Sequence, residues 1–122
     1  MSHPVVQFQI LTKEPDRHAA FYAEVLGWKI SAANALGYRV ADTGSPRGIN
    51  GGFWPAPPEA SAFVQLFTEI TNMAETIRKA TDNGGSVLIP PQTLPGGEQM
   101  AILRDPMGVT FGVMVPGKNG GQ

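Results

Sequence analysis

The chain opens with a segment in which apolar and polar residues alternate. Residues 5–11 read VVQFQIL, and this alternation of β-forming residues predicts a strand. A period of two gives the strand two faces, one with Gln7, Gln9 and Leu11 and the other with Val6, Phe8 and Ile10.

A helix is predicted directly after this strand. Glu14 is its expected N-cap, Pro15 suits its first position, and Gly27 is the expected C-terminal stop. The apolar positions within it suggest that an aromatic pair holds the helix against a sheet, and they are Phe21, Tyr22, Val25 and Leu26.

The pattern of one strand, one helix and three strands occurs twice. The runs WKIS, GYRVAD and INGGFWP follow the first helix, separated by turn signals. SAFVQLFTEI then predicts a strand and NMAETIRKATDN a helix, with Thr71 as N-cap and Gly84-Gly85 as the stop. We expect Met73, Ile77 and Ala80 to face inward. Three further strands are expected in SVLI, QMAILRD and VTFGVMV.

This duplication indicates the fold class. Glu14 and Thr71 lie 57 positions apart, and Gln7 and Gln65 lie 58 apart. Two copies are too few for a stacked solenoid. We therefore expect an α+β chain with two βαβββ modules, about residues 4–56 and 60–116, that close around a shared cleft; the resemblance described below implies that they form a curved mixed sheet. Residues 1–117 would form one domain, and the Gly-rich residues 118–122 a flexible tail.

Charge and composition exclude several classes of partner. Nine Lys and Arg balance ten Asp and Glu without a basic block, so nucleic acid is not an expected partner. No apolar run approaches the roughly 20 residues that span a bilayer, and the first residues carry no secretory signal pattern, so we expect a cytoplasmic protein and no membrane contact. The absence of cysteine excludes disulfides and thiolate chemistry.

Several local motifs, in this order, resemble one superfamily. EPDRHAAFYAEVLGWKI and LRDPMGVTFGVM carry most of the resemblance, and GGFWPAP and DNGGSVLIPP agree with it. Over about residues 5–115 the chain resembles the vicinal-oxygen-chelate superfamily of glyoxalase I, extradiol dioxygenases, fosfomycin-resistance enzymes and bleomycin-resistance proteins. The resemblance implies the glyoxalase/bleomycin-resistance/dioxygenase fold, with a U-shaped cleft usually completed within a dimer, so a homodimer is expected.

The resemblance also implies where a divalent metal ion would be held. Its ligands come from the first, fourth, fifth and eighth strands, and these positions fall on Gln7, near Gly52, on Gln65 and on Gly112. Such sites generally need about three ligands of His, Asp, Glu or Cys type. Glycine donates nothing, so we expect no metal and no cofactor. His3 and His18 are interpreted as terminal and structural residues.

The predicted cleft is therefore lined by amides, aromatic rings and a thioether, which suit a small, partly apolar molecule. We expect sequestration of a ligand, as in bleomycin-resistance proteins, and identify no catalytic residue. The candidate ligand-binding residues are Gln7, Gln9, Tyr38, Asn50, Trp54, Phe63, Gln65, Phe67 and Met114.

Two alternatives stay open from the sequence. One is a metal-dependent lyase, isomerase or dioxygenase of glyoxalase type. The other is a non-catalytic dimeric interaction module whose cleft is filled by Phe63, Phe67 and Met114. The segment Pro90 to Gln99 fits either a lid or a long hairpin connection, and Asp105 is expected to cap its Asp-Pro-Met-Gly turn.

Overall fold

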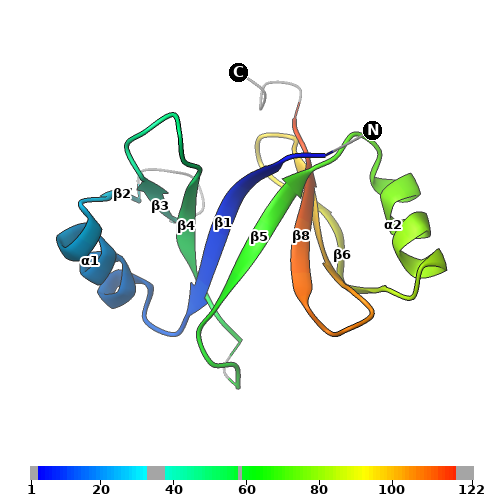
Figure 1. Ribbon diagram of the computed structural model, residues 1–122, viewed down its shortest axis with the longest axis horizontal. Coiled ribbons are helices and arrows are strands. Elements are labelled where there is room, and N and C mark those ends of the chain that lie inside the picture. Colours follow the sequence, from blue (N-terminus) through cyan, green and yellow to red (C-terminus); the bar gives the residue numbers. More distant parts are fainter. Residues whose placement is uncertain (1–2, 33–37, 58, 118–122) are drawn as a thin grey trace. The chain divides into compact units, whose positions relative to one another are not determined.

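The structure, a computed structural model, describes residues 3–32, 38–57 and 59–117 (Figure 1). The chain divides into two compact units. The N-terminal unit is Gln7–Gln65, and the C-terminal unit is Met1–Val6 with Leu66–Gln122. The predicted module bounds, 4–56 and 60–116, stay predictions, and the predicted tail lies outside the described residues.

The N-terminal unit has the predicted order of one strand, one helix and three strands. The elements are β1 (Val5–Thr12), of which Gln7–Thr12 belong to this unit, α1 (Pro15–Leu26), β2 (Lys29–Ser31), β3 (Arg39–Asp42) and β4 (Asn50–Pro55). In its sheet the strands lie in the order β2-β3-β4-β1. Strand β1 is parallel to β4, and the other two pairs are antiparallel. The parallel pair results because the chain returns through three strands after crossing over α1.

The ends of α1 follow the sequence signals. Pro15 stands in the first turn, and Gly27 adopts a left-handed conformation with φ 74°, donating its amide to the Ala23 carbonyl at 3.0 Å. Glu14 is the N-cap residue, as predicted, but its side chain makes no capping hydrogen bond. Its backbone N–H instead donates to Thr12 Oγ1 at 3.1 Å.

The packing face of α1 differs from the prediction. Ala19 is the buried residue of the helix, and Tyr22 stacks on Trp28 with ring centroids 5.0 Å apart. Phe21, at 57% exposure, lies outside this face. The aromatic-pair prediction is therefore right for Tyr22 and wrong for Phe21, because the small Ala19 turns its own side of the helix toward the sheet. The other exposed members of the predicted stripe are Val25 and Leu26.

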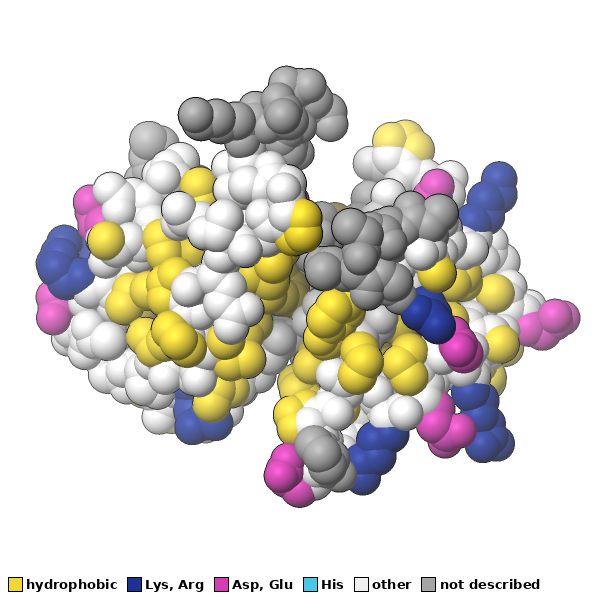
Figure 2. Space-filling model, turned by 180° about the vertical axis from the view of Figure 1, so that it is seen from behind, with side chains coloured by type: hydrophobic (Ala, Val, Ile, Leu, Met, Phe, Trp, Pro, Cys, Tyr) yellow, Lys and Arg dark blue, Asp and Glu magenta, His cyan; other side chains and the backbone are white. Residues whose placement is uncertain are grey.

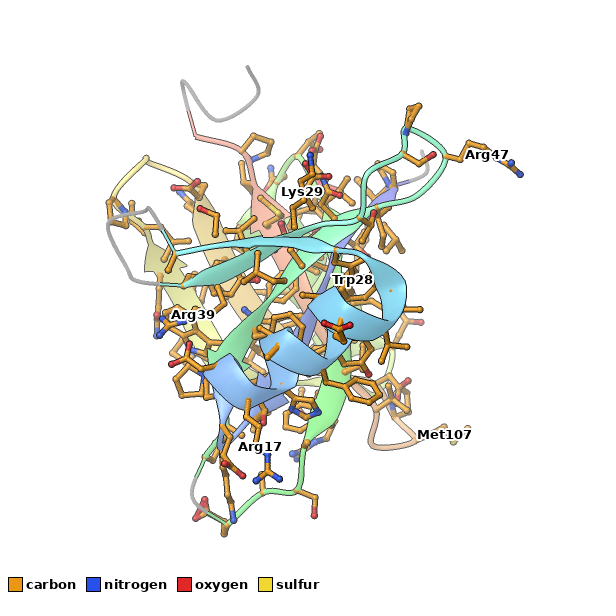
Figure 3. The ribbon with its side chains drawn as sticks, turned by 90° about the vertical axis from the view of Figure 1, so that its left-hand side faces the viewer. Arg17, Trp28, Lys29, Arg39, Arg47 and Met107 are labelled. Atoms are coloured by element: carbon orange, nitrogen blue, oxygen red, sulfur yellow. The ribbon has the colours of Figure 1, made fainter. Side chains whose placement is uncertain are left out.

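The core of the N-terminal unit lies between α1 and one face of the sheet. Figure 3 shows α1 lying over the strands, with Trp28 at its C-terminal end. Strand β1 contributes Phe8 and Ile10, which the alternation pattern placed on one face. The remaining members of this core come from α1, the connection after it and the other strands, and they are Ala19, Tyr22, Trp28, Ile30, Ala41 and Phe53.

The C-terminal unit repeats this connectivity. Its elements are β5 (Phe63–Glu69), of which Leu66–Glu69 belong to this unit, α2 (Met73–Asp82), β6 (Ser86–Thr93), β7 (Gln99–Arg104) and β8 (Thr110–Val115). Its strands lie in the order β5-β8-β7-β6, again with one parallel pair, β5 with β8. The α+β fold and its duplication are confirmed.

Helix α2 begins one residue later than predicted. Asn72 is the N-cap, and its Oδ1 accepts a hydrogen bond from the Glu75 amide at 3.0 Å, so the Thr71 prediction is wrong by one position. The distance from Glu14 to Asn72, 72 minus 14, is then 58 residues, equal to that between Gln7 and Gln65. The two N-caps thus follow the same repeat as the two glutamines.

The rest of the C-terminal unit agrees with the sequence in most details. Met73, Ile77 and Ala80 pack in its core, as predicted, with partners from β7 and β8. Gly84, with φ 91°, follows the helix end. Strand β6 continues past the predicted SVLI to Thr93, which is paired with Gln99 of β7. Residues 90–99 therefore form the end of a hairpin.

Hydrophobic side chains also reach the surface of the molecule (Figure 2). Met107 is 89% exposed at the β7–β8 turn and extends from it in Figure 3. The turn is held by Asp105, whose Oδ1 accepts from the amides of Met107 at 2.9 Å and Val109 at 3.0 Å. The predicted capping role of Asp105 is confirmed.

Of the helices in the described residues, neither is long and apolar enough to cross a membrane.

Candidate functional site

The parallel pairing of β1 with β4 places the predicted polar face of β1 beside β4. Gln7 neighbours Asn50, Gln9 neighbours Gly52, and Leu11 neighbours Trp54. Gln7, Gln9 and Trp54 are half-buried. Asn50 is exposed, and its Oδ1 accepts from the backbone amide of Thr43 at 2.9 Å and from its hydroxyl at 3.1 Å. Asn50 therefore serves the β3–β4 connection.

The side chain of Tyr38 lies directly over Gly52. A Cβ atom built at Gly52 would collide with the phenol ring and its oxygen, and would lie 2.6 Å from the Arg39 carbonyl. The rings of Tyr38 and Trp54 have centroids 5.2 Å apart. Glycine at position 52 is what allows the phenol to lie on the strand.

The amide of Gln9 completes this group, which we call the Tyr38 cluster: Gln9, Tyr38, Gly52 and Trp54. Burial raises the pKa of the Tyr38 phenol, and an interaction with the neighbouring Gln9 side chain opposes that rise. At neutral pH the phenol is uncharged, and the cluster offers neutral polar groups beside an indole.

In the C-terminal unit a glycine is also covered by an aromatic ring, here from the neighbouring parallel strand. Gly112 neighbours Phe67 across β5 and β8, and a Cβ at Gly112 would collide with the Phe67 ring, which is 2% exposed. Both glycines at the implied ligand positions are thus covered by an aromatic ring. These residues do not fit a metal ion. Within the described ranges, no group of three or more His, Asp or Glu side chains is arranged to hold one either.

The other predicted residues are divided between the units. Gln65 is buried at 3% exposure and Phe63 is half-buried on β5. Met114, in the C-terminal unit, is half-buried and neighbours Glu69 on β5 and Met100 on β7. Of the nine predicted residues, the structure brings Gln9, Tyr38 and Trp54 into one cluster.

Sequence reasoning missed a second feature of the N-terminal unit. A cavity of about 520 Å³ lies beside the first turns of α1 and is lined by His18 and Phe21, among others. His18 is half-buried, as expected for a structural histidine, and its Nδ1 lies 2.7 Å from Thr12 Oγ1. The sequence signal for this cavity was the spacing of His18 and Phe21, which lie three positions apart on α1. The cavity is also lined by residues 60–62, which are distant in sequence, so the spacing alone could not reveal it.

Comparison with known proteins agrees with this fold. Residues 4–113 match the Glyoxalase/Bleomycin resistance protein/Dioxygenase superfamily, and the chain belongs to this family. A protein of Mycobacterium bovis named "Putative glyoxylase CFP32" is 31% identical over 111 residues, which cover 88% of this chain. They cover 42% of that protein, so the chain spans less than half the length of the curated relatives it matches.

The solved structures that are similar in fold include two with low sequence identity. The hypothetical protein BH1468 from Bacillus halodurans C-125 has a TM-score of 0.72 at 14% identity, covering 98% of both chains. A glyoxalase/bleomycin resistance protein/dioxygenase superfamily member from Vibrio splendidus 12B01 has a TM-score of 0.63 at 11% identity, covering 93% of this chain and 98% of that one. At these identities the likeness is one of fold alone.

Proposed function

We propose that this chain binds a small, partly apolar molecule at the Tyr38 cluster without a metal ion. The observation that supports this most is the phenol ring over Gly52. At the position from which a metal ligand would extend, the chain has an aromatic ring with a side-chain amide beside it. The chemistry offered there is hydrogen bonding and ring contact.

The cluster favours a particular kind of ligand. An uncharged phenol, a primary amide and an indole N–H fix the orientation of polar groups, while the two rings contribute apolar contact area. A neutral molecule with a ring and one or two carbonyl or hydroxyl groups fits this set. Sequestration of such a molecule, as bleomycin-resistance proteins do, is the version that needs no catalytic group.

A metal-dependent lyase, isomerase or dioxygenase is the second candidate. The name of the Mycobacterium bovis relative favours an enzyme of glyoxalase type. The two covered glycines weigh against an enzyme of this kind. At each position a metal site would require a residue whose side chain coordinates the ion, and the aromatic ring that now covers the glycine would have to move. The third candidate, a dimeric interaction module, would bind neither ligand nor metal.

Ligand screening followed by site variants tests the binding proposal. A library of small neutral compounds would be screened by thermal shift, and each hit titrated while tryptophan fluorescence is recorded, since Trp54 is one of only two tryptophans. Tyr38→Phe removes the hydroxyl but keeps the ring, and we expect about tenfold weaker binding for one lost hydrogen bond. Tyr22→Phe is the matched control, because Tyr22 lies outside the cluster.

Metal analysis separates the binder from the enzyme. The protein would be incubated with nickel, zinc, manganese and iron(II), desalted and analysed for bound elements. Retention of about one ion per chain would overturn the metal-free proposal. A hit whose affinity is unchanged by Tyr38→Phe and by Gln9→Leu would place binding away from the Tyr38 cluster.

We further propose that two copies of the chain associate as a homodimer in the cytoplasm. The support for the dimer is the length of the curated relatives. This chain matches 42% of them, so a second domain of similar size would fit in the same polypeptide, and two copies of this chain would correspond to those two domains. Light scattering coupled to size exclusion measures the mass directly. A mass of 13.0 kDa, that of one chain, at micromolar concentration would contradict the dimer.

A further inference from the structure

One side of the cavity beside α1 is lined by polar groups that are held by hydrogen bonds. Thr12 is buried at 3% exposure, and its Oγ1 accepts the Glu14 amide at 3.1 Å. The same oxygen lies 2.7 Å from His18 Nδ1. The imidazole also stacks near Phe53, with centroids 6.2 Å apart. Because His18 Nδ1 interacts with Thr12, Nε2 is the ring nitrogen that can hydrogen-bond a ligand in the cavity.

The rim of the cavity carries more positive than negative charge. Lys13 and Arg17 line it together with one carboxylate, that of Glu14. Figure 3 shows Arg17 at the N-terminal end of α1, extending away from the helix. Its ion pair with Glu14 is long, at 3.6 Å, and the two side chains are 83% and 65% exposed. Such a pair contributes little, so an arriving anion can compete for the guanidinium.

An exposed aromatic ring forms the apolar wall. Phe21 is 57% exposed and meets Tyr22 edge-on, with centroids 5.3 Å apart and an interplanar angle of 83°. The helix packs through its other side, so this ring has no role in the core of the unit. A large ring beside two cations suits a planar apolar group attached to an anion.

We propose that this cavity binds a small aromatic carboxylate. The carboxylate meets Lys13 and Arg17, and the ring lies against Phe21, with the imidazole of His18 as a further polar contact. The site shares no residue with the Tyr38 cluster, so the proposal of carboxylate binding here does not depend on whether a ligand binds at that cluster.

The test is a titration with benzoate followed by amide NMR shifts. Benzamide keeps the ring without the charge, and acetate keeps the charge without the ring. We expect benzoate to saturate with a Kd on the order of 1 mM, shifting amides of residues 12–22 and 60–62, while the two partial ligands bind at least about fivefold more weakly.

Variants assign the contacts. Lys13→Gln and Arg17→Gln should each weaken benzoate about fivefold, as for an exposed charge pair. Phe21→Ala should weaken it by a similar factor. Arg78→Gln is the matched control, an exposed arginine of α2 that pairs with Asp82 at 3.3 Å, and it should leave the Kd unchanged.

Three results would overturn the proposal. Equal affinity for benzoate and benzamide would remove the role of the cations. Equal affinity for benzoate and acetate would remove the role of Phe21. Shifts confined to other residues, or no saturation by benzoate, would remove the site itself. Because the substituted side chains are exposed, an unchanged amide spectrum without ligand establishes that each variant is folded.

Discussion

Replacing Gly52 by alanine tests the ring-over-glycine arrangement most directly. The new methyl group would occupy the position of the Tyr38 phenol, so the ring has to move or the strand has to shift. Overpacking of this kind typically costs about 1 to 3 kcal/mol. Moving the ring also disrupts its packing against Trp54, whose ring centroid is 5.2 Å away, and its interaction with Gln9, so we expect the upper half of that range. The corresponding fall in Tm is roughly 4 °C per kcal/mol for a chain of this size.

A double-mutant cycle gives the prediction a quantitative form. In the background of Tyr38→Ala the ring is absent, and Gly52→Ala then retains its clash with the Arg39 backbone carbonyl at 2.6 Å. We expect an interaction energy of at least about 1 kcal/mol between positions 38 and 52, measured by urea denaturation followed by circular dichroism. Gly48→Ala is the matched control, because its Cβ meets only Thr43 Oγ1 at an ordinary 3.5 Å.

Either of two results would refute the reasoning. If Gly52→Ala is as stable as Gly48→Ala, the phenol does not lie over the glycine. If the two effects at positions 38 and 52 add without interaction, the cost arises from the strand backbone and not from the ring.

Three further predictions concern the helices. Asn72→Ala should lower the free energy of unfolding by about 1 kcal/mol, whereas Thr71→Ala should cost clearly less; thermal melts compare the two, and the reverse order would contradict the observed cap. The pKa of Asp16 is lowered by its hydrogen bond and charge interaction with Arg39, so that pair stabilises the fold above the unfolded pKa of about 4 and loses this effect as pH falls through the lowered value. Asp16→Asn should therefore be less stable than the parent at pH 7 and approach it in acid; a difference that grows on acidification would refute this assignment. Phe21→Ser should cost less than about 1 kcal/mol, because the ring is 57% exposed, and a loss typical of core aromatics, about 3 kcal/mol or more, would restore the predicted role in packing.

The order of the elements and their duplication could be predicted from the amino-acid sequence alone. Strand alternation, proline at the start of α1 and glycine after its end act within a few residues, so they can be recognised without knowing the partners in space. The N-cap of α2 was missed by one position because Thr71 and Asn72 are both good caps, and only the backbone decides which of them reaches the Glu75 amide.

Which side chains contact one another could be known only from the folded chain. Tyr38 reaches Gly52 because the antiparallel register of β3 with β4 pairs Val40 with Gly52, and a shift by one residue would turn the ring to the other face. The packing side of α1 was likewise set by the small size of Ala19, which lets the helix approach the sheet and leaves Phe21 exposed. Contacts of this kind depend on strand register and on the volumes of residues distant in sequence. Neither of these can be predicted from a local pattern in the chain.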